Sequence, residues 1–334
     1  MARAANVSIS TVSRAISQPD RVGEATRARV MAVIREMGYV PSRVAQRLRK
    51  EHGHAHLIGL ILPDIQNPFF ADLARGVEDL AQKHGYALFL GNSDEDLEKE
   101  RQYLEAMRAE SVDGVIVPPI SDSDKAVSSM IRVGVPVVCV DRRIDGADAD
   151  TVVVDNVRGA YAATDHLIRL GHRRIGFIEG RPQISTSRER MQGYRQALQA
   201  HGLEFDPELV REGDSRQASG ARLAGELLDI SDRPTALLVG NNLMTLGALE
   251  TCHARQIHIP EQLAVVGYDD MPWALALNPP LTAVRQPGYE VGQRAMELLL
   301  ARIREPDRST ALIVLQPQLI VRRSCGAGLP LRKR

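Results

Sequence analysis

The sequence predicts an α/β protein with an all-helical N-terminal segment. From Leu57 onward, continuous apolar runs typical of buried strands alternate with amphipathic helical patterns. This alternation indicates open, mostly parallel sheets with helices on their faces, and the runs are numerous enough for two sheets. The first 40 residues show helical periodicity alone. A chain of 334 residues is long enough for about two domains with sizeable cores.

Charge is distributed unevenly along the chain. The whole sequence carries 42 Lys and Arg residues and 42 Asp and Glu residues, but Met1–His56 holds ten basic against four acidic residues. The remainder therefore holds 32 basic against 38 acidic residues. A basic end on an acidic body indicates nucleic-acid binding at that end.

The segment Val7–Ser17 is predicted to form a short helix after an N-cap at Ser8. Val7 and Val12 stand at the two positions of a hydrophobic staple. Val12 and Ile16 are one turn apart and are expected to face a small core. The opposite side carries hydroxyl groups and one guanidinium but no carboxylate, which suits base edges and phosphates in a major groove. That side holds Ser10, Arg14 and Ser17.

Two further helices complete a predicted helix-turn-helix head. Ala2–Ala5 is the last turn of a preceding helix, and Asn6 is the turn residue because Asn tolerates the left-handed conformation. A third helix is predicted over Glu24–Met37, and its inner face holds Val30, Ile34 and Met37. The alternative is a surface helix of some other small bundle.

Beyond the head, strands and helices are predicted in alternation. The strands are residues 57–62, 86–91, 113–118, 135–140, 174–180, 235–240 and 263–268. The helices are Phe69–His84, Leu97–Ala109, Gly159–Leu170, Arg188–His201, Ala218–Leu228, Leu243–Ala254 and Val291–Ile303.

Several classes of protein and site are not expected. Cys139, Cys252 and Cys325 form no CxxC pair, and Cys139 lies in an apolar strand run, so buried, reduced thiols are expected. The three histidines of EHGHAH lack a fourth ligand and rigid support, so neither a metal nor another cofactor is expected. No GxSxG, HExxH, GxxxxGK[ST] or GxGxxG motif is present, so the chain is not expected to be an enzyme. The N-terminus has no apolar signal region and no run of eighteen apolar residues occurs, so a cytoplasmic location without membrane contact is expected.

The motifs of the head resemble a known family. ANVSISTVSRAIS and VGEATRARVMAVIREMGYVPSRVAQRLR are similar to the DNA-binding head of the lactose-repressor/galactose-repressor family. The likeness continues through LIGLILPDIQNPFF, LGHRRIGFIEG, RERMQGYRQAL, GNNLMTLGAL and VVGYDD, and so covers nearly the whole chain. The resemblance implies a helix-turn-helix head over residues 1–40, a hinge helix and linker over 41–56, and an effector-binding and dimerisation domain over 57–334.

The resemblance also implies the architecture of that last domain. It should have two lobes of the periplasmic-binding-protein type with a ligand cleft between them, and residues 281–286 and 311–321 should return across the cleft. The tail after residue 326 is too short for the heptad helix that makes some relatives tetramers, so a homodimer is expected.

Operator DNA is the first partner that the resemblance implies. The expected DNA-contacting residues are Ser8, Ser10, Thr11, Ser13, Arg14, Ser17, Arg43, Ala45 and Leu48, with Arg47, Arg49 and Lys50 holding phosphates. In the hinge, Leu48 matches the leucine that relatives wedge into the minor groove. The alternative for residues 39–50 is a disordered basic linker. Ala2–Ala5 supplies only about one turn of the first helix. We therefore expect either that the true start codon lies upstream or that the gene has lost its beginning, and that a chain extended upstream in frame binds the operator more tightly.

A small-molecule effector is the second implied partner. The residues that match effector-contact positions lie mostly after strands and are Phe69, Phe70, Asp141, Arg142, Thr186, Arg190, Ser215, Asn241 and Asp269. Ser215 stands where many relatives carry an aromatic that stacks on the ligand, which disfavours a purine or other large ring. Carboxylates, amides and guanidinium groups suit a polyhydroxylated ligand. A sugar, a sugar acid and a sugar phosphate all remain open.

Each of these residues also has a structural explanation. Phe69 would begin a helix and pack in the core, Arg142 would pair with Asp145 on the surface, and Asp269 would cap a turn before Pro272. Taken together, the sequence and the resemblance predict a ligand-controlled, sequence-specific transcriptional regulator, a repressor in the first instance. The alternative is a sugar-binding protein of the periplasmic-receptor type without effective DNA binding, which would need a signal peptide and would lack the basic head.

Overall fold

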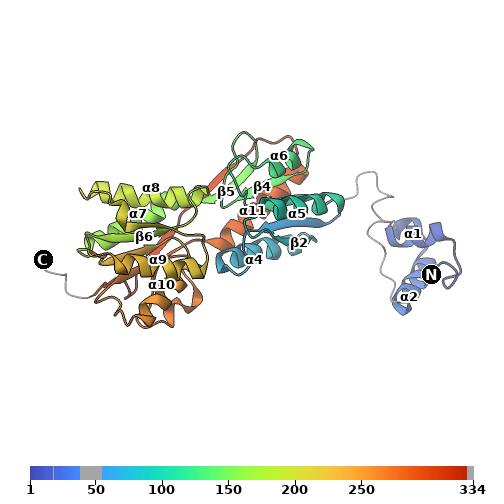
Figure 1. Ribbon diagram of the computed structural model, residues 1–334. Helices are drawn as coiled ribbons and strands as arrows, with labels where there is room; N and C mark the ends of the chain where they lie inside the picture. Colours follow the sequence, from blue (N-terminus) through green and yellow to red (C-terminus); the bar gives the residue numbers. More distant parts are fainter. Residues whose placement is uncertain (18, 38–54, 329–334) are drawn as a thin grey trace. The chain divides into compact units, whose positions relative to one another are not determined.

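The protein is described by a computed structural model that covers residues 1–17, 19–37 and 55–328. It divides into two compact units, Met1–Ala55 and His56–Arg334, which we call the head and the body. The head is all-helical and the body is mixed α/β (Figure 1), which confirms the predicted fold class. The hinge residues Arg43, Ala45 and Leu48 lie outside the described residues, as do Arg47, Arg49 and Lys50.

The head contains α1 (Ile9–Ser17), η1 (Pro19–Arg21) and α2 (Glu24–Glu36). Residues 2–5 form one turn, closed by a 2.9 Å bond from the Ala5 amide to the Met1 carbonyl, and Asn6 has the positive φ of 49° expected at the turn. Ser8 caps α1, since its hydroxyl accepts from the Thr11 amide at 3.1 Å. The small core is formed by Ala5, Val12, Ala15 and Val30, with Ile16 and Ile34 partly buried against it.

One expectation for the head was wrong. Met37 does not lie on the inner face of α2, because the helix ends at Glu36 and Met37, its C-cap, is exposed. Ala5, by contrast, is fully buried although its helical turn is short. The turn before Asn6 therefore contributes a central residue to the core of the head.

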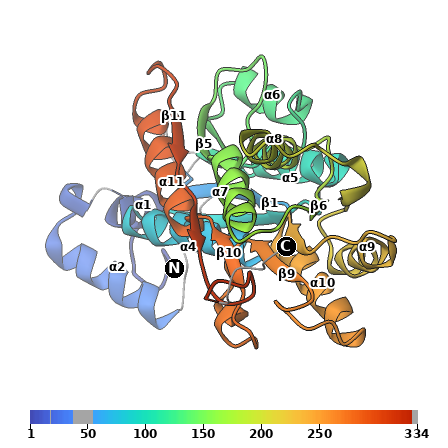
Figure 2. The same ribbon diagram turned by 90° about the vertical axis from the view of Figure 1, so that its left-hand side faces the viewer.

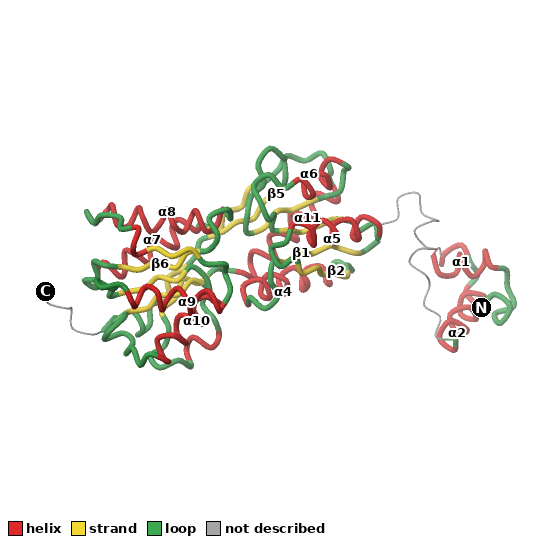
Figure 3. Tube along the Cα trace, viewed as in Figure 1, coloured by secondary structure: helices red, strands yellow, loops and turns green. Residues whose placement is uncertain are grey.

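The body has two lobes, each built on one mostly parallel sheet (Figures 1 and 3). We call residues 57–154 and 288–315 lobe 1, and residues 156–285 and 318–328 lobe 2. The strands of lobe 1 are β1 (Leu57–Leu62), β2 (Ala87–Asn92), β3 (Gly114–Val117), β4 (Val137–Val140), β5 (Asp150–Val154) and β11 (Leu312–Leu315). Those of lobe 2 are β6 (Ile175–Glu179), β7 (Val210–Glu212), β8 (Ala236–Val239), β9 (Ala264–Tyr268), β10 (Thr282–Arg285) and β12 (Gln318–Ile320).

The two sheets repeat one topology. Their strand orders are β2-β1-β3-β4-β5-β11 and β7-β6-β8-β9-β10-β12, so each strand of lobe 1 has a counterpart in lobe 2. The chain crosses between the lobes after β5, after β10 and after β11, which agrees with the predicted returns. β11 lies beside β5 at the edge of its sheet (Figure 2). Only two residues separate β11 from β12. The chain therefore enters the second sheet directly from the cleft, and β12 runs antiparallel to β10.

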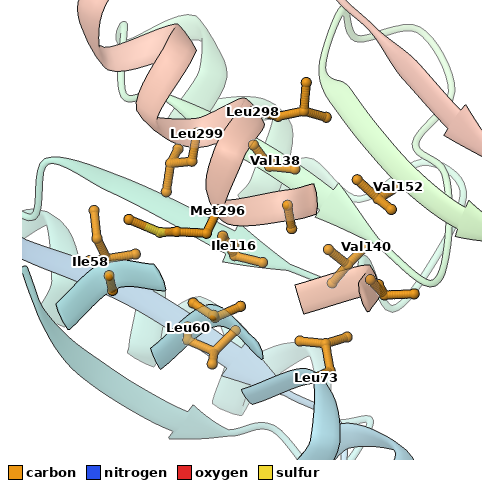
Figure 4. Close-up of a cluster of buried hydrophobic side chains, with 14 of the residues drawn as sticks. Ile58, Leu60, Leu73, Ile116, Val138, Val140, Val152, Met296, Leu298 and Leu299 are labelled. Atoms are coloured by element: carbon orange, nitrogen blue, oxygen red, sulfur yellow. The ribbon is translucent and has the colours of Figure 1, made fainter. Parts of the chain in front are cut away.

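Helices cover both faces of each sheet. In lobe 1, α4 (Pro68–Lys83) and α11 (Gly288–Arg304) cover one face, and α5 (Leu97–Ala109) and α6 (Lys125–Arg132) cover the other. In lobe 2, α7 (Asn156–Arg169) and α8 (Ser185–Ala200) lie opposite α9 (Gln217–Asp229) and α10 (Asn242–Ala254). Figure 4 shows Ile58 and Leu60 of β1 packed against Leu73 of α4 and Met296 of α11. Residues of one strand alternate between the two cores, and both sides are apolar, which explains the continuous apolar run.

Two strands and one α-helix of the body were not predicted, namely β5, β7 and α6. β7 is a half-exposed edge strand of three residues with the polar sequence VRE. α6 has eight residues, which is too few for a clear helical pattern.

Three helix pairs cross at glycines. A Cβ on Gly76 of α4 would lie 2.1 Å from the Tyr289 carbonyl oxygen, and one on Gly193 of α8 would lie 2.1 Å from the Val157 carbonyl oxygen. A Cβ on Gly247 of α10 would lie 2.0 Å from the Gln217 carbonyl oxygen of α9. These contacts are with backbone, which cannot move aside as a flexible side chain would. The close approach of the paired helices therefore depends on glycine.

We predict that Gly247→Ala lowers the free energy of unfolding by about 1–3 kcal/mol or more, because α9 and α10 must separate to admit the methyl group. Chemical denaturation of the full chain measures the change. Gly225→Ala on α9 is the matched control, since its Cβ would meet the mobile end of the Arg255 side chain at 2.9 Å. The control should be neutral or stabilising, as Ala favours helix over Gly. Equal losses in both variants would contradict the explanation.

Candidate functional site

A pocket lies between the two lobes, with about 730 Å³ of space including its open mouth. Its wall contains all nine residues expected at the effector site: Phe69, Phe70, Asp141, Arg142, Thr186, Arg190, Ser215, Asn241 and Asp269. It also contains polar residues that sequence reasoning missed, among them Asp64, Asn67, Glu95, Ser187, Asp214 and Arg216. All of these except Glu95 stand within a few residues of the expected ones, so the loops themselves were the available signal.

Asp141 and Asp269 occupy equivalent places in the two lobes. Each is the first residue after its strand, β4 or β9, and each has a positive φ, 63° for Asp141 and 69° for Asp269. The Asp141 amide donates to the Val152 carbonyl of β5 at 3.0 Å, and the Asp269 amide donates to the Val284 carbonyl of β10 at 2.8 Å. Left-handed backbone is uncommon for residues other than glycine and is concentrated at functional sites. The repeated strand order thus brings two buried carboxyl groups to one pocket.

Arg190 of α8 is held firmly from lobe 2. Its Nε donates to Asn156 Oδ1 at 2.9 Å and its Nη1 to the Gly240 carbonyl at 2.5 Å. Its guanidinium carbon lies 3.8 Å from the centre of the Tyr268 ring, a cation–π arrangement. These contacts fix the orientation of the side chain before any ligand arrives.

Arg142 is held from lobe 1 and does not pair with Asp145. Its side chain is 6% exposed, its Nη2 donates to Glu95 Oε1 at 2.7 Å, and its Nε lies 3.3 Å from Asp141 Oδ2. Burial raises the pKa of Asp141, while the charges of Arg142 and Arg190 lower it. Burial likewise raises the pKa of Asp269, against the lowering effect of Arg190.

The remaining predicted residues combine structural and pocket positions. Phe69 and Phe70 open α4 behind the Asn67 cap, pack in the core of lobe 1 and still line the pocket. The Asn241 side chain caps α10 at the Met244 amide and donates to the Ser215 carbonyl at 2.9 Å. The Asp269 carboxylate accepts from Gln286 Nε2 at 2.6 Å. Asn241 therefore also fixes the position of the loop that contains Ser215.

The outer face of the head carries the predicted DNA-contacting groups. Ser8, Ser10 and Thr11 form a hydroxyl cluster, with Ser8 Oγ 2.8 Å from both Ser10 Oγ and Thr11 Oγ1. Arg14 is exposed, Ser13 is half-buried, and Ser17 ends α1. Ile9, which was not expected at the site, is 74% exposed at the start of α1. An apolar side chain beside hydroxyls could have been noticed in the sequence, since thymine methyl groups form apolar contacts in the major groove.

Comparisons with known proteins agree with this geometry. Residues 1–42 match the model for bacterial regulatory proteins of the lacI family, and residues 164–325 match a periplasmic binding protein-like domain. The HTH-type transcriptional repressor PurR of Aliivibrio fischeri (strain MJ11) is 36% identical over 328 residues, which cover 97% of this chain and 96% of that protein. The chain belongs to the lacI family of bacterial regulatory proteins.

Two solved structures extend the likeness over the whole fold. The lac repressor dimer bound to operator and the anti-inducer ONPF has a TM-score of 0.84 and 27% identity, and the match covers 97% of both chains. The complex of the transcriptional regulator CelR with cellobiose has a TM-score of 0.74 and 34% identity, and covers 97% of this chain and 98% of that one. This lacI-family member is thus a ligand-responsive, DNA-binding transcriptional regulator, and its similar relatives are repressors and not enzymes.

Other expectations concern the surroundings of the site. Cys139, Cys252 and Cys325 are buried and free, as predicted. The described residues contain no group of three metal-ligating side chains, while His52 and His54 of EHGHAH lie outside them. Across the described ranges, no helix has both the length and the apolar character needed to cross a bilayer.

Contacts between the lobes close around the pocket. Asn242 Nδ2 donates to Asn67 Oδ1 at 2.6 Å, and both side chains are buried. Three ion pairs share one polarity, with the acid on lobe 1 and the arginine on lobe 2. They are Asp64–Arg216 at 3.7 Å, Glu95–Arg181 at 4.0 Å and a close Asp122–Arg188 pair.

We predict that a variant with Arg181→Gln, Arg188→Gln and Arg216→Gln is more open than the wild type at low salt. Small-angle scattering should give a larger radius of gyration, because three attractions across the cleft are lost. High salt should reduce the difference between the two proteins, since salt screens exposed ion pairs.

The matched control neutralises three arginines whose partners lie within lobe 2, namely Arg169→Gln, Arg222→Gln and Arg255→Gln. It has the same net charge as the test variant and should keep the wild-type radius. If both triple variants opened equally, net charge and not the pairs across the cleft would be responsible.

Proposed function

We propose that this regulator is a repressor that binds its operator as a homodimer and that a sugar bound between the lobes controls it. The proposal rests on the composition of the pocket. Lobe 1 supplies Asp141 and Arg142 to it, lobe 2 supplies Asp269 and Arg190, and all four side chains are buried. Such pairs present hydrogen-bond donors and acceptors side by side, which suits the hydroxyl groups of a sugar. We infer that the protein works in the cytoplasm, where bacterial operator DNA lies.

In this proposal the nine predicted pocket residues hold the effector, and the outer face of α1 reads the half-site. Ser8, Ser10, Thr11, Ser13, Arg14 and Ser17 form the DNA-contacting set, and Ile9 adds an apolar contact. Arg43, Ala45 and Leu48 are assigned to the hinge on the sequence alone. The effector acts by preferring one of two closure states of the lobes, since equal affinity for both states would shift nothing.

We predict that Arg14→Ala weakens binding to an operator far more than binding to random DNA. A bidentate contact from Arg to a base contributes about 1–3 kcal/mol of discrimination, and random DNA does not offer that contact. Operator fragments are first selected from a random library with the wild-type protein, and fluorescence anisotropy then gives both affinities. The control is Arg29→Ala, an exposed arginine on α2 that should affect both DNAs alike. Equal losses for Arg14→Ala on the two DNAs would make Arg14 a phosphate contact.

We predict that Asp269→Asn leaves operator affinity nearly unchanged and abolishes the response to the sugar. The carboxylate lies in the pocket of the body, and its loss removes a charged hydrogen-bond acceptor for hydroxyl groups. Operator anisotropy is titrated with a sugar identified by thermal-shift screening. Asp229→Asn, an exposed acid of lobe 2 paired with Arg255, serves as the control and should respond normally. A variant of Asp269 that loses its fold instead would show a structural role.

A further inference from the structure

Glu95 occupies a constrained position at the rim of lobe 1. It is the third residue after β2 and directly precedes Asp96, the N-cap of α5. Ser215 occupies the equivalent position in lobe 2, third after β7 and just before the N-cap residue of α9. Both have positive φ, 57° for Glu95 and 67° for Ser215, and both line the pocket. The repeated fold therefore places one carboxylate and one hydroxyl at matching points of the wall.

The carboxylate of Glu95 neutralises Arg142. The Glu95 side chain is 14% exposed and accepts from Arg142 Nη2 at 2.7 Å, while Asp141 lies on the other side of the same guanidinium. The buried guanidinium of Arg142 thus faces two carboxylates, and Arg181 lies 4.0 Å from one of them, so the four charges are balanced when both acids are ionised. An anionic ligand would gain little from Arg142, since its attraction is offset by the two neighbours at close range.

The other cations of the pocket are also balanced. Arg216 faces Asp64 at 3.7 Å, and Arg181 faces Glu95 at 4.0 Å. Arg190 donates to the Asn156 and Gly240 oxygens, and Asp141 and Asp269 lie near enough for its charge to lower the pKa of both. The first turns of α4 and α10 are capped by Asn67 and Asn241, so part of their donor capacity is already used.

Two features of the described wall favour an anion. Arg142 Nε and Nη1 are buried and make no hydrogen bond within the described residues. The second feature is the start of α8 and of α9, since neither helix has a side-chain cap. α8 begins at the pocket, and Thr186 and Ser187 lie in its first turn. The backbone amides at the start of α8 can donate a hydrogen bond either to a phosphate oxygen or to a hydroxyl oxygen of a ligand. The surrounding carboxylates decide between them, because they repel the phosphate and accept hydrogen bonds from the hydroxyl.

We propose that Glu95 is a specificity-determining residue, which by neutralising Arg142 reserves the pocket for uncharged sugars and excludes sugar acids and sugar phosphates. The inference rests on the proposed function that a sugar occupies this pocket. It assigns the exclusion to one side chain, so that removing its charge should admit anions without altering the rest of the wall.

The test compares anion binding to the full-length wild type and to Glu95→Gln. Gln keeps the size of the side chain and a carbonyl acceptor for Arg142 but removes the charge. Isothermal titration with inorganic phosphate at constant ionic strength should show about tenfold tighter binding to Glu95→Gln than to the wild type, because a unit charge beside the ligand is lost. D-ribose 5-phosphate should gain over D-ribose by a similar factor.

Two further variants separate the proposed cause from others. Arg181→Gln breaks the contact of Glu95 across the cleft but leaves Arg142 neutralised, and it should not gain anion affinity. Glu95→Gln combined with Arg142→Gln also removes the guanidinium that Glu95 neutralised, and it should return to wild-type anion affinity. The unfolding temperature of each variant checks its fold, and Glu95→Ala, which should show the same gain, replaces any unstable Gln variant.

The outcomes distinguish this inference from the function on which it rests. Unchanged phosphate affinity in both Glu95 variants, or wild-type protein that prefers D-ribose 5-phosphate to D-ribose, overturns the role of Glu95. An equal gain in Arg181→Gln also overturns it and assigns the effect to lobe opening. If neutral sugars fail to stabilise the wild type while phosphate affinity rises as expected, the sugar effector is wrong but the charge assignment of Glu95 stands.

Discussion

The strands of both sheets present their carboxyl ends to one cleft, and the functional chemistry of the body depends on this constraint. In a parallel sheet the loops after the strands gather at a single edge. Because the two sheets repeat one order, β4 and β9 deliver Asp141 and Asp269 from opposite sides with the same left-handed backbone. β12 is the antiparallel exception, since its chain arrives directly from the cleft. The pocket therefore follows from topology before any side chain is considered.

Burying charge at this edge requires partners, and the pairing links the pocket to the closure of the lobes. Asp141 lies beside Arg142, whose other partner Glu95 also reaches Arg181 in the opposite lobe. A buried pair that loses one member leaves an uncompensated charge, which is far more costly than losing an exposed pair. The charged groups of the pocket and the ion pairs between the lobes thus form one network, and Glu95 takes part on both sides.

The buried strands could be predicted from the sequence pattern, and the pocket positions from the family resemblance together with the loops that follow those strands. A strand buried on both faces, such as β1, is apolar throughout, and the first polar residue after it marks the cleft edge. β7 was not predicted because it is a half-exposed edge strand and therefore lacks a continuous apolar run. Glu95 was not predicted as a pocket residue, because it is held there by a hydrogen bond from Arg142, which lies 47 positions further along the chain. Met37 was placed inward by periodicity, but the helix ended one residue earlier.

The three crossings between the lobes explain how such a pocket can respond to a ligand by a change of lobe angle. Each crossing is a short segment next to a strand end, so the lobes can change their angle while both sheets stay intact. The head is joined through the chain to β1, which belongs to lobe 1. A ligand that favours one closure angle therefore fixes the place of lobe 1 relative to lobe 2. The ligand needs no contact with the head, only a difference in affinity between two closure states.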